Sequence, residues 1–288
     1  MVGAIALWSF SGLCFAEGGR SLGPMVFTTF ACLVGSLTGT LFHIVRGGSL
    51  REIVVMPARA WIAGFFGIAV YTVVLALAFR MSPTRDLPLI ALINYLWPVL
   101  MVILAGLLLH ERGNARLAAA GVALGVAGVA VAEGPRALLR SPSALVPEAM
   151  ALCAAFLWAL YSVLLKAWKT PDQNNSSNAA FFLCAVLSAI VGGIRGEWQH
   201  IPAVTPMAVF WILFCGIGPI GIAYYLWELG VKRAPAQLVA AFSFFIPIFG
   251  TMVVALAFRE SLSFDLVPAA LFVGCGAYLA KRSTDPAR

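Results

Sequence analysis

The sequence predicts an all-α polytopic membrane protein with ten transmembrane helices, built as two inverted five-helix repeats around a central cavity. Of its 288 residues, 61% are hydrophobic and only 11% are charged, whereas about a quarter of the residues in a soluble domain carry charge. The mean hydropathy is +0.95, and similar residues recur in the two halves of the chain. These observations leave no room for a soluble domain between the apolar segments.

Ten apolar runs follow one another along the chain, and each approaches the roughly 20 apolar residues that one spanning helix needs. Charges, glycines and prolines mark where each run ends. The runs lie at residues 2–16, 23–45, 60–79, 87–109, 115–132, 146–165, 178–194, 205–229, 235–258 and 264–280. The first run is short enough to resemble a signal peptide, but it lacks a basic leader and is interpreted as the first helix.

Basic residues favour one side of the membrane. Most of the 19 lysines and arginines fall in the segments that are inside when the N-terminus is inside. The positive-inside rule therefore predicts that both termini are cytoplasmic. Arginines on the predicted outer side are Arg20, Arg80, Arg85, Arg136, Arg140, Arg195 and Arg259. No basic stripe is present, so nucleic-acid binding is not indicated.

An internal repeat divides the chain. A linker at 134–145, rich in proline and arginine, separates a first repeat at 1–133 from a second at 146–282, and 283–288 form a cytoplasmic tail. A shift of about 149 residues aligns the halves at several positions. Since five helices per half is an odd number, the second half must enter the membrane in the opposite orientation. Inverted repeats of this kind are typical of transporters that bind substrate at mid-membrane.

A polar, aromatic cluster beside a proline occurs once in each half. In the first half Asn94 precedes Pro98 by four residues, and in the second half Ser243 precedes Pro247 by the same spacing. Each proline removes the hydrogen bond to the carbonyl four residues earlier, and at membrane depth such backbone is tolerated only in protein or against a wet cavity. We predict that the two kinks face each other across a substrate cavity, with Pro219 as a third kink.

The candidate substrate-binding residues are aromatic or small and polar, and they fall in mid-run positions. They are Tyr71, Asn94, Tyr95, Trp97, Trp158, Tyr161, Tyr224, Ser243 and Phe244. Asn94 has an alternative role as an interhelical hydrogen-bonding residue. Five tryptophans near run ends or without polar neighbours are interpreted as interfacial anchors: Trp8, Trp61, Trp168, Trp198 and Trp211.

Glu228 is the one carboxylate expected at depth, and an intramembrane ionisable residue is a functional hypothesis by default. It precedes Lys232 by four residues, so an interfacial ion pair competes with a coupling role. The histidines lie in separate loops and no phosphate-binding loop is present, so neither an enzyme, nor a metal or cofactor site, nor ATP drive is indicated. Glycines on the fifth and tenth helices predict close helix packing within one bundle.

The chain resembles the drug/metabolite transporter superfamily, of the EamA type. The resemblance rests on a central proline followed by a leucine-rich stretch and a glutamate in both halves, at 98–111 and 247–260. Asn94 to Pro98, with Leu7-Trp8-Ser9 and Trp158, is similar to bacterial aromatic amino acid exporters, which are also linked to methyl viologen efflux. The resemblance implies an inner-membrane bundle whose cavity is lined mainly by the third, fourth, eighth and ninth helices, with parts of the first and sixth.

The resulting prediction is an exporter of aromatic and other neutral amino acids that works by alternating access, as a monomer. One alternative is a multidrug or organic-cation exporter in which Glu228 neutralises the ligand. A second is a channel-like or structural membrane protein. Because Ile246 stands where the first repeat has Trp97, we expect an asymmetric cavity with most stacking surface from one half.

Overall fold

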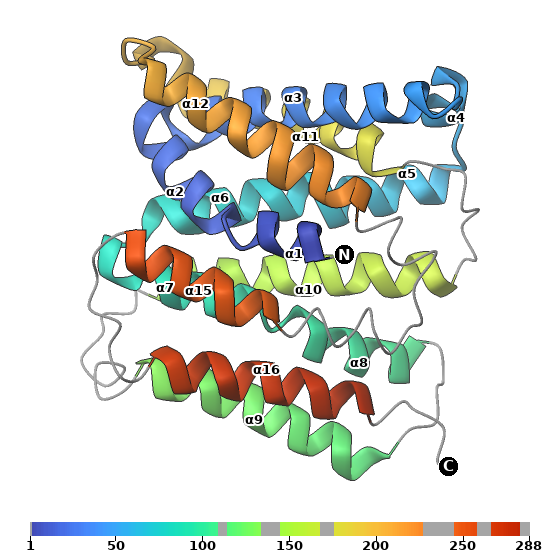
Figure 1. The fold of residues 1–288 in the computed structure, drawn as a ribbon, viewed down its shortest axis with the longest axis vertical. Helices are drawn as coiled ribbons and strands as arrows, with labels where there is room; N and C mark the ends of the chain where they lie inside the picture. Colours follow the sequence, from blue (N-terminus) through green and yellow to red (C-terminus); the bar gives the residue numbers. More distant parts are fainter. Residues whose placement is uncertain are drawn as a thin grey trace.

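A computed structural model describes residues 2–108, 114–133, 145–167, 176–226, 245–257 and 266–282. Within these ranges the chain is helical and no strand occurs. The helices run side by side in one elongated bundle, with α3, α11 and α12 at one end and α9 and α16 at the other (Figure 1). The first half contains α1 (Val2–Trp8), α2 (Ser11–Leu22), α3 (Pro24–Val45), α4 (Leu50–Val54), α5 (Ala58–Gly64), η1 (Phe65–Val70), α6 (Tyr71–Met81), η2 (Thr84–Asp86), α7 (Leu87–Asn94), α8 (Trp97–Leu108) and α9 (Ala115–Glu133).

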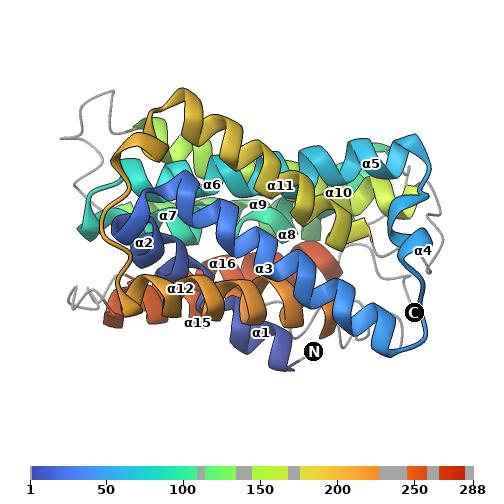
Figure 2. The same ribbon diagram turned by 90° about the horizontal axis from the view of Figure 1, so that it is seen from above.

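The second half is described less continuously. It contains α10 (Leu145–Ala167), α11 (Ser176–Ile194), η5 (Glu197–His200), α12 (Pro206–Cys215), η6 (Gly216–Ile222), α15 (Phe245–Ala257) and α16 (Leu266–Arg282). Its helices interleave with those of the first half, since α3 packs against both α11 and η6. Figure 2 shows α3 lying between α11 and α12. The core is therefore shared between residues that are far apart in the sequence.

Seven helical segments in the described part of the chain are long and apolar enough to cross a membrane: Val2–Leu22, Pro24–Val45, Ala58–Met81, Thr84–Leu108, Leu145–Leu164, Ser177–Ile194 and Pro206–Leu226. They correspond to the first four and to the sixth, seventh and eighth predicted helices. The membrane-spanning, all-helical class is thus confirmed. The fifth, ninth and tenth predicted helices contain α9, α15 and α16, which are not among these seven, so the count of ten stays a prediction.

The first span is longer than the sequence indicated. The prediction ended it at residue 16, where Glu17 begins a polar stretch, but α2 continues to Leu22. Arg20 Nη1 lies 3.3 Å from Glu17 Oε1, one helical turn away. Because this pair offsets both charges at the end of the helix, Glu17 and Arg20 extend the span instead of terminating it.

The fourth span is broken where the sequence placed its polar cluster. α7 ends at Asn94 and α8 begins at Trp97. Leu96 N–H donates to the carbonyl of Ile93 at 3.1 Å, in a tightened final turn. Pro98 is the second residue of α8, where a missing N–H costs little, and its absence leaves the Asn94 carbonyl without the usual helical donor.

Two π-helices interrupt corresponding spans of the two halves. η1 separates α5 from α6 in the third span, and η6 follows α12 in the eighth and contains Pro219. π-helical turns are rare and occur frequently at functional sites. Tyr71 directly follows η1, and Tyr224 comes two residues after η6.

The predicted glycine contact between the fifth and tenth helices is present as an extensive interface of α9 with α16. A Cβ on Gly276 would lie 2.6 Å from the Gly121 carbonyl oxygen and 2.7 Å from Gly125 N. The two backbones therefore approach so closely that only glycine fits at position 276.

The start of α3 is held by a carboxylate from the other half of the chain. Glu197 Oε2 accepts from the Met25 N–H at 2.8 Å, and Glu197 Oε1 lies 3.1 Å from Arg195 Nε. We expect Glu197→Ala to lower the free energy of unfolding by about 1 kcal/mol, because α3 loses both a cap and a favourable charge at its N-terminus. Thermal unfolding in detergent measures this change. Gln199→Ala, on the same exposed turn, is the matched control, and an equal effect from both variants would contradict the assigned role.

Candidate functional site: an aromatic cavity at the broken helices

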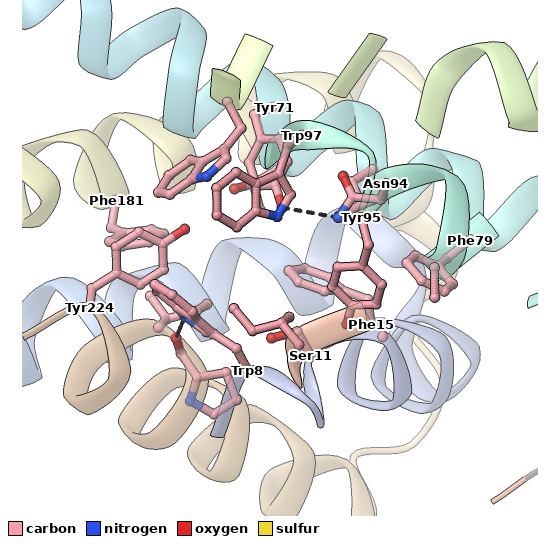
Figure 3. Close-up of a pocket in the computed structure, with 18 residues that line it drawn as sticks. Trp8, Ser11, Phe15, Tyr71, Phe79, Asn94, Tyr95, Trp97, Phe181 and Tyr224 are labelled. Carbon is pink, nitrogen blue, oxygen red and sulfur yellow. Dashed lines mark hydrogen bonds between the residues drawn. The ribbon is translucent and has the colours of Figure 1, made fainter. Parts of the chain in front are cut away.

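A cavity of about 80 Å³ lies where the interrupted helices meet, which is room for several water molecules. The first span is broken between α1 and α2, as the fourth is between α7 and α8. Both breaks and both spans that contain a π-helix contribute to the cavity wall, and Figure 3 shows their side chains converging on it. Its described lining is Trp8, Ser11, Gly12, Phe15, Tyr71, Thr72, Leu75, Phe79, Ala91, Asn94, Tyr95, Trp97, Trp158, Phe181, Pro219, Ile220, Tyr224 and Ile246. No aspartate or glutamate occurs among these described lining residues.

Trp158 of α10 is the centre of an aromatic cluster. Its ring centroid lies 5.7 Å from that of Tyr71, 6.4 Å from that of Trp97 and 5.6 Å from that of Tyr224. The Trp97 and Tyr224 rings meet it nearly edge-on, at interplanar angles of 83° and 89°. Such pairs contribute about 0.5–1.5 kcal/mol beyond burial. The cluster therefore forms a preformed aromatic wall contributed by both halves of the chain.

Asn94 gives this wall its polar group. The side chain is 6% exposed, and its Nδ2 donates to the Tyr71 hydroxyl at 3.4 Å (Figure 3). Its Oδ1 is buried and has no hydrogen-bond partner in the described part of the structure. A buried amide oxygen without a partner carries a desolvation cost of about 1–3 kcal/mol. A bound ligand that donates a hydrogen bond to Oδ1 would remove this cost.

Trp8 joins the first break to the π-helix η6. Its indole Nε1 donates to the Pro219 carbonyl at 3.0 Å, and its ring lies 5.1 Å from that of Tyr224. The interpretation of Trp8 as an interfacial anchor is therefore wrong. The helix breaks at residues 9–10, and the end of α1 lies against the cavity and the Pro219 carbonyl.

The start of α2 also opens onto the cavity. The first helical bond of α2 runs from Cys14 N–H to the Phe10 carbonyl at 2.9 Å. The N–H groups of Ser11, Gly12 and Leu13 therefore precede the helical ladder, and Phe10 provides no side-chain cap. Free N–H groups at a helix N-terminus favour an anion.

Most of the predicted site residues in the described ranges come together here. Tyr71, Asn94, Tyr95, Trp97, Trp158, Tyr224 and Pro219 line the cavity. Tyr161 does not line it; its ring lies 5.5 Å from that of Trp158, and Gly67 of η1 packs against its Cβ. Ser243, Phe244 and Glu228 fall outside the described residues, and Pro247 is the third residue of α15.

Phe15, Phe79 and Phe181 were missed by the sequence interpretation, although they contribute rings to the wall. Each occurs in an apolar run where a phenylalanine carries no signal of its own. Helical spacing could have predicted Phe79, because it lies eight residues after Tyr71 and therefore near the same face of α6. Ile246 lines the cavity as the counterpart of Trp97, so the expected difference between the halves is present at this position.

The chain has extensive similarity to proteins named as aromatic amino acid exporters. It is 30% identical to the aromatic amino acid exporter YddG of Ancylobacter novellus, over 96% of this chain and 94% of that protein. YddG of Salmonella typhimurium is 26% identical over 98% of this chain and 95% of its own length, and YddG of Escherichia coli is 25% identical over 96% and 93%.

A solved crystal structure at 26% identity superposes with a TM-score of 0.73, covering 97% of this chain and 95% of that one. The sequence model of the EamA-like transporter family matches residues 1–133 and 146–282. These matches identify a multi-pass membrane transporter and exporter, not an enzyme. The protein belongs to the EamA-like transporter family.

Proposed function

We propose that this protein exports aromatic and other neutral amino acids across the bacterial inner membrane, as a monomer. The observation that carries the proposal is the aromatic cluster around Trp158, in which a buried amide, Asn94, faces the same cavity. The relatives named as aromatic amino acid exporters support the same substrate class. A flat side chain would pack against the rings of Trp97 and Trp158 that line the cavity, where edge and stacked ring contacts are available.

The proposed binding mode uses the two helix breaks for the two charges of the amino acid. The carboxylate is placed at the N-terminus of α2, where the N–H groups of Ser11 to Leu13 are free of the helical ladder. The ammonium group is placed at Asn94, whose Oδ1 lacks a partner in the described structure and whose carbonyl is freed by Pro98. Ser11 at the start of α2 and Asn94 at the end of α7 line the same cavity, so these ends of opposite partial charge face a common space.

Transport would follow from rocking of two inverted five-helix repeats, 1–133 and 146–282, about this site. The two broken spans and η6 contribute residues to the cavity wall, and η1 directly precedes Tyr71, which also lines it. Helix interruptions are positions where a bundle can bend without losing its other helical hydrogen bonds. Pro98 lies beside the break between α7 and α8, and Pro219 lies within η6. Pro247 is the proposed counterpart of Pro98 in the second repeat.

An organic-cation exporter is the main alternative, because the same rings would bind a flat cation. The described lining contains no carboxylate to neutralise such a ligand, which favours a zwitterion. Counterflow of labelled phenylalanine into liposomes containing the purified protein separates the two. Saturable counterflow, blocked by tryptophan but not by methyl viologen, supports the proposal. Block by methyl viologen alone would establish the alternative, and a linear flux without saturation would indicate a channel.

The proposed orientation has its own test. We expect a reporter that is active only in the periplasm to be inactive when fused after residue 282, and active when inserted between η5 and α12. The basis is the concentration of lysine and arginine on the predicted cytoplasmic side. A periplasmic signal from the C-terminal fusion would overturn the orientation while leaving the cavity unaffected.

A further inference from the structure

A second cavity lies between the ends of α2 and α6 and the start of α7. Its volume is about 220 Å³, which exceeds that of the aromatic cavity. It is lined by Phe15, Ala16, Gly19, Arg20, Phe79, Arg80, Ser82, Pro83, Thr84 and Leu87. All three helices belong to the first half of the chain, and Figure 1 shows them near one another on the left side of the view.

The two cavities follow one another along the same faces of the same helices. On α2, Ser11 lines the inner cavity, Phe15 lines both and Arg20 lines the outer cavity. On α6, Phe79 again lines both. Residues four apart lie one above the other on a helix, so each face continues from one cavity to the next. Phe15 and Phe79 form the partition between the cavities.

The outer cavity differs from the inner one in charge. Arg20 and Arg80 both line it, and no carboxylate occurs in its described lining. Arg20 Nη2 donates to the Thr84 hydroxyl at 2.6 Å and its Nη1 to Glu17 Oε1 at 3.3 Å, so its guanidinium is held in place. Arg80 is exposed and forms no ion pair with the described acidic residues. The wall therefore offers one anchored guanidinium and one that is free to bind an anion.

We propose that this outer cavity is a second substrate station, which binds the carboxylate of the amino acid after it has passed Phe15 and Phe79. Arg80 makes the main contact, and Arg20 with the Thr84 hydroxyl completes the anion site. Guanidinium and carboxylate groups match in charge and in the geometry of paired hydrogen bonds. The apolar side chain of the ligand remains against the two phenylalanines. This inference rests on the proposed function, because the carboxylate assigned to the outer cavity belongs to the proposed amino acid substrate.

The test compares Arg80→Gln, Arg80→Lys and Arg85→Gln in phosphatidylcholine liposomes, where no anionic lipid competes. Arg85 is the matched control, because its side chain is 71% exposed and it lines neither cavity. Two competitors are added on the side of the outer cavity: 3-phenylpropionate, which carries only the carboxylate, and phenethylamine, which carries only the ammonium group. The half-inhibition concentration of each is measured against phenylalanine counterflow.

We expect Arg80→Gln to raise the half-inhibition concentration of 3-phenylpropionate about threefold to fivefold, as for a partly exposed charge pair. The half-inhibition concentration of phenethylamine should stay unchanged or fall in Arg80→Gln. Arg80→Lys keeps the positive charge, so its half-inhibition concentration for 3-phenylpropionate should stay close to that of the unaltered protein. Arg85→Gln should change neither value. Equal shifts in Arg80→Gln and Arg85→Gln would show that surface charge in general, and not the outer cavity, affects inhibition, and would overturn the site. The absence of a shift in Arg80→Gln would also overturn it.

Failure of the proposed function is distinguishable from failure of the outer site. If the unaltered protein carries no phenylalanine, the substrate assignment fails. The outer site is then still tested by thermal unfolding of the purified protein with and without 3-phenylpropionate. Stabilisation that Arg80→Gln loses and Arg85→Gln keeps supports the site. Stabilisation of the same size in all variants, or none in any, would overturn it.

Discussion

Trp97→Ala and Asn94→Ala should each abolish phenylalanine counterflow while leaving folded protein in the membrane. Trp97 forms part of the aromatic wall, and its ring centroid lies 6.4 Å from that of Trp158. Truncating a buried aromatic contact of this kind costs about 2 kcal/mol or more, which is roughly a 30-fold loss of affinity. For Asn94 the lost group is the buried amide that binds Tyr71 and presents Oδ1.

The measurement is initial counterflow at subsaturating phenylalanine, with protein amount and thermal unfolding recorded in parallel. Trp61→Ala is the control, since Trp61 does not line the cavity. Asn94→Asp separates the roles of the amide: a carboxylate there should preserve binding of the ammonium group better than alanine does. Full counterflow in both Trp97→Ala and Asn94→Ala would remove the cavity from the transport path.

Gly276→Val should give the largest loss of stability among single substitutions outside the cavity. The added Cβ would meet the Gly121 carbonyl oxygen at 2.6 Å and Gly125 N at 2.7 Å, which are backbone atoms that cannot rotate away. α16 and α9 must then separate along their interface. Overpacking of this kind costs about 1–3 kcal/mol, and the rigid partners place this site at the upper end.

Thermal unfolding in detergent and the yield of monodisperse protein report this effect. Gly106→Val is the matched control, because nothing lies within 4 Å of a Cβ built at Gly106 of α8. Its stability should remain within about 0.5 kcal/mol of the parent, as for other surface positions. Equal losses in the two variants would show that helix propensity, and not the α9–α16 contact, sets the stability.

The membrane class and much of the cavity wall could be predicted from the sequence because the decisive signals are local. A run of apolar residues sets a span, and Asn94 beside Pro98 in such a run marks backbone that lipid cannot accommodate. Tyr71, Trp97 and Trp158 were identified for the same reason: each stands mid-run, where no interface is available to a polar aromatic side chain.

The remaining features depend on contacts across the chain. Trp8 was missed as a cavity residue because its position in the bundle depends on the break before Ser11 and on the Pro219 carbonyl, 211 residues away. The role of Phe15 and Phe79 as a partition depends on α2 packing against α6. Likewise Glu17 looked like a terminator until Arg20 was found to pair with it. In each case the contacts that a side chain makes in the folded protein decide the outcome.

The π-helices have a consequence for how sequence length is constrained in this protein. A π-helical turn holds one residue more than the α-helical turn it replaces, and each α-helical residue advances the side chain by about 100°. Deleting a single residue from η1 would therefore restore an α-helical turn, and α6 would keep the direction in which Tyr71 faces Trp158. The same holds for η6 and Tyr224. The π-helices of the third and eighth spans thus take up one extra residue each without changing the direction of the binding side chains that follow them.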